Sequence, residues 1–290
     1  MLSKLKAIFE DPPPGMAFEI SEAGIAAARI GTRAELEWHP LKVGTLAVSP
    51  LKENVVDVDE FTMAVRALAN TQSTRRRKDV ALILPDFSAR ISVLDFDSFP
   101  TDAKEQAALV RFRLKRSVPF DVESAAVSYW AQTGANKRVD VVVVMAPLEI
   151  IARYEALFRA MNFHAGEVTT SALAALRLCP PAPRADAVNV IAKLSGKTLT
   201  VMVLRGEILK LFRCVALEEV TDEQILAVLH PTLSYVEDEL AAPAEKLTLC
   251  GLPQGALSGL HYEKDVLRSS FGTPGAFNAG LLGYLEGARN

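Results

Sequence analysis

One β-hairpin pattern occurs twice in this chain of 290 residues, once near the start and once beyond the middle. The first copy runs over residues 17–30 and turns at Ser21 to Gly24, whereas the second runs over 188–204 and turns at Ser195 to Lys197. A third extended segment follows each hairpin, and in the second copy it spans Glu207 to Cys214. Strand-forming residues separated by glycine-containing turns indicate antiparallel meanders. A meander that opens each half predicts a duplicated α/β chain.

Composition limits the class of protein that this chain can be. Half of the residues are hydrophobic and the net charge is −3, so we expect a large core and no global attraction to nucleic acid. The three cysteines, Cys179, Cys214 and Cys250, lack CxxC spacing, which argues against a zinc site and favours a reducing cytoplasm. No apolar run approaches the ~18–20 residues that cross a bilayer. A cytoplasmic protein without a metal centre is therefore expected.

Prolines and helix signals divide the chain into an expected order of segments. A tail of residues 1–14 ends in a proline run, and residues 15–100 together with 164–180 form the expected first domain. Between them, residues 101–163 have the order helix, strand, strand, helix, which predicts an inserted α+β subdomain. A proline-rich linker precedes the expected second domain over 184–290.

Two helices in the second half carry residues with structural consequences. Residues 221–240 form one long expected helix with Pro231 near its middle, where a proline predicts a kink or a split. The last helix, expected over 276–287, contains Gly280 and Gly283. Small residues at this spacing predict that the helix packs closely on another element.

Motifs for catalysis or phosphate binding are weak. Ser195, Gly196 and Lys197 imitate the end of a phosphate-binding P-loop, but Ile191 stands where that loop needs its first glycine. A β-rich segment follows instead of a helix whose N-terminal amides bind phosphate, so we interpret these residues as a hairpin turn. The four histidines have no metal-ligand spacing, and no nucleophile motif is present. We therefore expect no enzyme activity.

A basic amphipathic helix is expected inside the inserted block, ending before Phe120. Arg111, Arg113 and Arg116 make this helix basic, and Phe112 adds apolar surface. One interpretation is a solvated surface helix. The other is a groove for an acidic or amphipathic peptide, in which the arginines bind carboxylates and the aromatic side chains supply contact area.

Several short motifs occur in an order that is known from one protein family. They are Leu84-Pro85-Asp86, the Val-Pro-Phe end of the basic helix, the strands over 127–130 and 141–147, the turn at 205–208 and the closing segment 279–283. These motifs resemble the actin-like superfamily and, within it, the PilM family of type IV pilus assembly proteins. The resemblance implies an α/β fold of the duplicated actin-like (ribonuclease H-like) type, with an inserted α+β subdomain and a reduced second half.

The resemblance also implies a role and a place in the cell. It implies a cytoplasmic scaffold at the inner face of the inner membrane, which binds the cytoplasmic tail of an inner-membrane PilN-type protein. Other pilus platform proteins are further expected partners, and contact with the membrane would come through partners. We place the tail in a groove beside the basic helix and the first-domain sheet, with these partner-binding residues: Arg111, Phe112, Arg113, Arg116 and Phe120.

The chain departs from the PilM family at the turns that hold phosphate in actin-like proteins. Where the family has Asp-Ile-Gly-Ser, this chain has Glu19-Ile20-Ser21-Glu22, and Glu22 adds a charge that repels phosphate. Lys193 and Ser195 stand where the second turn of the family has aspartate and glycine, beside Gly196. Gly251 is followed by a leucine instead of a second glycine, which adds bulk near the ligand.

A fourth departure is a short connection from residues 214–217 to 221–223, where the family has a small subdomain over the nucleotide. We therefore expect nucleotide binding to be weak or lost, with no cofactor, and bound ATP with magnesium is the alternative.

One rival is a functional ATP-binding actin-like pilus protein. A second is an enzyme of the sugar-kinase branch, for which no catalytic aspartate can be assigned. A third is a GspL-type secretion scaffold, whose domain would be followed by a transmembrane segment.

Overall fold

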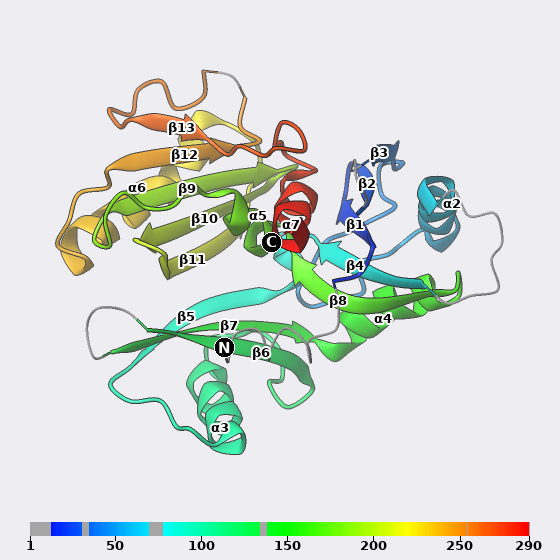
Figure 1. Cartoon of the computed structure of the whole chain (residues 1–290), viewed down its shortest axis with the longest axis horizontal. Helices are drawn as coiled ribbons and strands as arrows, with labels where there is room; N and C mark the ends of the chain where they lie inside the picture. Colours follow the sequence, from blue (N-terminus) through cyan, green and yellow to red (C-terminus); the bar gives the residue numbers. More distant parts are fainter. Residues whose placement is uncertain (1–12, 31–34, 70–77, 134–137, 254, 290) are drawn as a thin grey trace.

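The described residues fold into three β-sheets with helices packed on their faces (Figure 1). The computed structural model describes residues 13–30, 35–69, 78–133, 138–253 and 255–289. The expected N-terminal tail therefore lies almost wholly outside the described residues. Among the described residues, no helix combines the length and the apolar character that crossing a membrane requires.

The first sheet contains the first hairpin and has the strand order β3-β2-β1-β4-β8. Its strands are β1 (Met16–Ser21), β2 (Gly24–Arg29), β3 (Glu35–Pro40), β4 (Lys78–Leu84) and β8 (Phe163–Thr170). Strand β1 pairs antiparallel with β2 and parallel with β4. The hairpin and the third strand of the meander lie where the sequence predicts them.

The helices α2 (Val58–Ala69) and α4 (Leu148–Arg159) bury their apolar faces in one core with this sheet. Phe18 of β1 packs edge to face on Phe158 of α4, with ring centroids 5.1 Å apart. This packing corrects the expected inserted block over 101–163, because α4 belongs to the core of the first sheet. Helical periodicity identified α4, but it does not specify which sheet the apolar face covers.

The second sheet repeats the arrangement of the first, with the strand order β11-β10-β9-β12-β13. Its strands are β9 (Val188–Ser195), β10 (Thr198–Arg205), β11 (Ile208–Ala216), β12 (Lys246–Cys250) and β13 (Lys264–Val266). Strand β9 pairs antiparallel with β10 and parallel with β12, as β1 does with β2 and β4. The duplicated α/β architecture is confirmed.

The helix α6 (Asp222–Glu239) packs on the second sheet and begins soon after β11, so the short connection is also present. Its side chains Leu229, Leu233 and Val236 are buried in the core of that sheet. Pro231 lies inside the helix, and the helix continues past it as one element. The expected split therefore does not occur.

A third, small sheet has the order β5-β7-β6 and carries one helix on its outer face. Its strands are β5 (Arg90–Phe96), β6 (Ala125–Thr133) and β7 (Val139–Pro147), and its helix is α3 (Ala103–Leu114). Figure 1 shows α3 on the side of this sheet that faces away from the other two sheets. The inserted unit therefore begins before residue 101, with β5, and ends with β7.

The last helix, α7 (Ala279–Arg289), lies between the two large sheets against α5 (Ser171–Ala175) and the 3₁₀ turn η2 (Leu176–Leu178) (Figure 1). The backbones of α7 and α5 approach so closely that a Cβ atom on Gly283 would lie 2.1 Å from the carbonyl oxygen of Ala174. The close packing predicted for this glycine-containing helix is confirmed.

We expect Gly283→Ala to lower the free energy of unfolding by at least about 1–3 kcal/mol, because the added methyl group would overpack the contact between α7 and α5. The control is Gly259→Ala, whose added Cβ would meet no atom within 4 Å. Urea denaturation of both variants measures the difference. Equal transition midpoints would contradict the close helix contact.

Candidate functional site

The two hairpin turns face each other across a narrow cleft between the first and second sheets. The cavity there has a volume of about 20 Å³, and its lining includes Glu22, Ser195 and Gly196. A Cβ atom on Gly196 would lie 3.7 Å from a carboxylate oxygen of Glu22. Ser21 closes its own turn, since its hydroxyl donates to the carbonyl of Gly24 at 2.8 Å. Of the residues expected at a nucleotide site, the cleft is therefore lined by Ser21, Glu22, Ser195 and Gly196.

Two buried carboxylates behind the turns bind the first turns of two helices. Glu19 accepts hydrogen bonds from the hydroxyl of Ser171 and from the backbone N–H of Leu281, the latter at 2.7 Å. Asp86, in the 3₁₀ turn η1 (Asp86–Ser88), accepts from the backbone N–H of Ala172 at 2.6 Å. A carboxylate satisfies the unpaired N–H groups at a helix N-terminus and is stabilised there by the helix dipole.

A buried lysine completes this cluster. Lys193 Nζ donates to Asp86 Oδ2 at 3.0 Å, and the Lys193 side chain has no exposed surface. Thr200 donates to the same carboxylate oxygen at 3.1 Å. Burial alone would lower the pKa of Lys193, but the negative charges of Asp86 and Glu19 outweigh it, so the pKa is raised. Burial raises the pKa of Glu19.

The cleft offers little space for a nucleoside triphosphate. A cavity of about 20 Å³ is close to the space that one water molecule needs. The carboxylate of Glu22 borders this cavity, and Lys193, the cation behind it, already pairs with Asp86. Gly251 has φ of +72°, and a Cβ atom there would lie 2.2 Å from the carbonyl oxygen of Leu194. Protein backbone therefore occupies the space beside Gly251.

Some side chains of the basic helix make contacts within the protein, and others are exposed to solvent. Arg111 donates to the backbone carbonyls of Val122 and Ala125, so its guanidinium stabilises the loop before β6. Arg113 lies over the ring of Phe96 at 5.0 Å. Phe120 packs against the core of the small sheet.

The side chains of Phe112 and Arg116 are exposed. Phe112 belongs to α3 and Arg116 to the turn after it, and α3 packs on the face of the small sheet that points away from the first sheet. The location expected for the groove, between this helix and the first-domain sheet, is therefore wrong. A partner role for the five residues stays a prediction.

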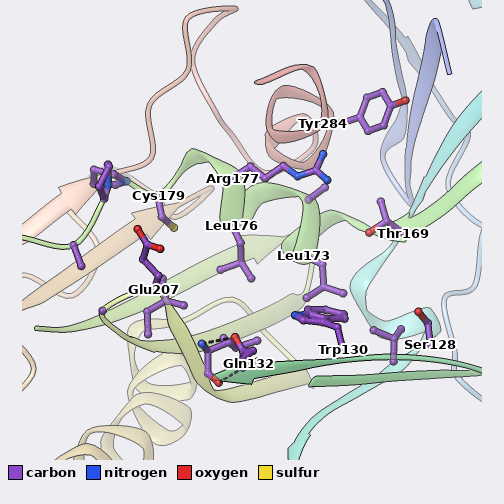
Figure 2. A pocket seen from close by; sticks show the side chains of 18 of the residues that line it. Ser128, Trp130, Gln132, Thr169, Leu173, Leu176, Arg177, Cys179, Glu207 and Tyr284 are labelled. Atoms are coloured by element: carbon purple, nitrogen blue, oxygen red, sulfur yellow. Dashed lines mark hydrogen bonds between the residues drawn. The ribbon is translucent and has the colours of Figure 1, made fainter. Parts of the chain in front are cut away.

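A large groove lies on the opposite face of the small sheet. This groove has a volume of about 550 Å³ and is bounded by all three sheets (Figure 2). Trp130 of β6, Leu173 of α5 and Leu176 of η2 supply apolar surface, and Trp130 is 42% exposed. Glu167 of β8 and Glu207, in the turn between β10 and β11, add negative charge. Ligand sites in proteins have about this size and mixture of surfaces.

Polar contacts hold the small sheet against the second sheet at the base of the groove. The side-chain amide of Gln132 donates to the carbonyl of Leu209 at 2.9 Å and accepts from the N–H of Leu209 at 3.0 Å (Figure 2). Lys210 forms an ion pair with Asp140 of β7. These contacts fix the distance between two walls of the groove.

Solved structures identify the fold of this chain. One chain of a PilM–PilN type IV pilus biogenesis complex matches it with a TM-score of 0.70 and 18% identity, and the match covers 97% of this chain and 100% of that one. A protein of unknown function from Bacteroides thetaiotaomicron, described as having an actin-like ATPase fold, matches with a TM-score of 0.51 and 12% identity over 87% and 90% of the two chains. The fold is actin-like.

The cytoplasmic domain of EpsL, an inner-membrane component of the type II secretion system of Vibrio cholerae, also has a similar fold. Its TM-score is 0.54 at 13% identity, and the match covers 95% of this actin-like chain and 94% of that domain. Neither protein-family models nor curated sequences match the chain. The likeness to PilM that the sequence motifs predict is thus confirmed for the fold.

Sequence reasoning missed Asp86, Ser171 and Thr200 as members of the buried cluster. A signal for it was present, because Lys193 interrupts the apolar strand Val188 to Leu194. A lysine inside a buried strand requires a carboxylate partner. Asp86 lies two residues after the end of the apolar strand β4, which makes it the natural candidate.

Asp86→Ala is expected to lower the free energy of unfolding by about 3–5 kcal/mol, because Lys193 would stay buried without its counter-charge. The control is Asp95→Ala, which removes an exposed carboxylate 3.6 Å from Arg138 and should cost less than about 1 kcal/mol. Guanidinium denaturation compares the two variants. Similar losses of unfolding free energy in the two variants would show that the buried ion pair contributes no more to stability than an exposed one.

Proposed function

We propose that this protein is a cytoplasmic PilM-like scaffold of type IV pilus assembly, which binds the cytoplasmic tail of an inner-membrane PilN-type protein. The observation that carries the proposal is the contrast between an open groove of about 550 Å³ and a cleft of about 20 Å³. The similar fold of a chain from a PilM–PilN complex supports the choice of partner. Association with other pilus platform proteins, and with the inner face of the membrane through partners, is part of the same proposal.

The geometry of the groove suits an extended peptide. Strand β8 is the last strand of the first sheet in the described order, and its consecutive residues Glu167, Val168 and Thr169 line the groove. Such an edge offers backbone N–H and C=O groups to which a peptide can add as a further strand. On the floor of the groove, Trp130 presents a half-exposed aromatic ring on which an apolar side chain of the peptide can pack.

In this proposal, nucleotide binding is weak or lost and the protein is not an ATPase. The small volume of the cleft, the carboxylate of Glu22 in its lining and the occupation of Lys193 by Asp86 support this part of the proposal. A scaffold role requires only that the groove is held in shape. No residue of the chain is assigned a catalytic role.

Trp130→Ala is expected to weaken binding of a synthetic PilN-type tail peptide by about 2 kcal/mol, or roughly thirtyfold in Kd, because an aromatic anchor would be lost. The matched control is Phe112→Ala, which removes an aromatic ring that is 77% exposed on the opposite face of the small sheet. Isothermal titration calorimetry with both variants makes the comparison.

The same titration tests the basic helix as an alternative binding surface. The double variant Arg113→Ala and Arg116→Ala should bind the peptide as the wild type does. Lost affinity in this variant or in Phe112→Ala, with full affinity in Trp130→Ala, would move the partner site from the groove to α3.

Millimolar Mg-ATP is expected to leave the melting temperature unchanged, because the cleft has no room for the nucleotide. A ligand at 100 times its dissociation constant would stabilise the protein by ~2.7 kcal/mol, which a thermal melt detects readily. The tail peptide, measured in the same assay, is the positive control. A rise of several degrees with Mg-ATP would support a functional ATP-binding protein instead.

A further inference from the structure

The buried lysine joins the two halves of the chain at one point. Lys193 belongs to β9 of the second sheet, whereas its partner Asp86 follows β4 of the first sheet, 107 residues earlier. Both side chains are at most 1% exposed, so water does not screen the pair. A buried ammonium group without a counter-charge is strongly unfavourable, and therefore the two sheets cannot separate here without cost.

The hydrogen bonds of the cluster extend from this pair to the helices between the sheets. Asp86 binds the first turn of α5 through Ala172, and it also accepts from Thr200 of β10. Glu19 of β1 binds the first turn of α7 through Leu281. The positive charge of Lys193 is thus placed among carboxylates that fix elements from both halves.

We propose that Lys193 is a built-in clasp, whose ammonium group supplies from within the chain the positive charge that holds the two halves together. In this view, the halves stay together without a bound cation or nucleotide. Charge and space both support this role. The ammonium neutralises a carboxylate at the junction, and the neighbouring cleft of about 20 Å³ leaves no room for a larger ligand to do so.

The clasp also affects the width of the groove. Leu173 and Leu176 come from elements bound to the first sheet, whereas Leu204 and Leu209 come from the second sheet, and all four line the groove. Fixing one sheet against the other therefore fixes the width of the groove. This consequence rests on the proposed function, but the clasp itself is independent of any partner.

Chemical rescue tests the clasp on the full chain. Lys193→Ala should lower the melting temperature by about 10 °C, because the carboxylate of Asp86 would lose its buried counter-charge. Small alkylammonium ions such as ethylammonium should restore a large part of this loss, since they can enter the vacated space. The control is Lys264→Ala, at an exposed position, which should melt as the wild type does and gain nothing from the amine.

A melting temperature of Lys193→Ala equal to that of the wild type would overturn the clasp. An amine effect of the same size in Lys193→Ala and Lys264→Ala would also overturn it. These readouts involve no peptide, so a failure of the clasp is distinct from a failure of the proposed function.

A second variant keeps the test decisive if Lys193→Ala does not fold. The double variant Lys193→Met and Asp86→Asn replaces the ion pair by neutral groups of similar volume, a change that proteins often tolerate. Lys193→Met alone leaves the carboxylate of Asp86 buried without its counter-charge, so this variant should melt well below the double variant. Equal melting temperatures of the two would overturn the clasp, because the charge of Lys193 would then have no role at the junction.

Discussion

The buried ion pair between Lys193 and Asp86 places a charge at the point where the first and second sheets meet, and the elements around that point are arranged about it. The pair lies where both sheets meet α5 and α7, and the carboxylates of the cluster bind the first turns of those helices. The groove walls come from elements on both sides of this junction. An internal charge therefore sets the geometry of a surface on which a partner can bind.

Local patterns in the sequence were enough to predict most of the fold. Both meanders, most helices and the duplicated order follow from alternation, helical periodicity and turn residues, which act over short distances. The place of α4 did not follow, because an apolar face such as that of Ile150 and Tyr154 predicts burial without naming the sheet that buries it. Assignment of a helix to a sheet depends on the tertiary fold, which no local pattern encodes.

The candidate sites, too, were predicted where local sequence patterns are enough and missed where the tertiary fold decides. The altered turns could be read from Glu22, Lys193 and Ser195, and the structure brings these residues close to one cleft and its buried cluster. The groove was missed, although the alternation of β6 places Ser128, Trp130 and Gln132 on one face. Charge and aromatic content pointed to α3 instead, because sequence alone cannot show which face of a sheet remains uncovered.

We propose that the groove, and not the cleft, is the site where this protein binds its ligand. Hydrogen–deuterium exchange, measured with the tail peptide and separately with Mg-ATP, distinguishes the two sites. The peptide should slow exchange along β8 and β6, and Mg-ATP should leave exchange unchanged. Protection by Mg-ATP of the turns around Ser21 and Ser195, with none along β8 from the peptide, would overturn the assignment of the ligand to the groove.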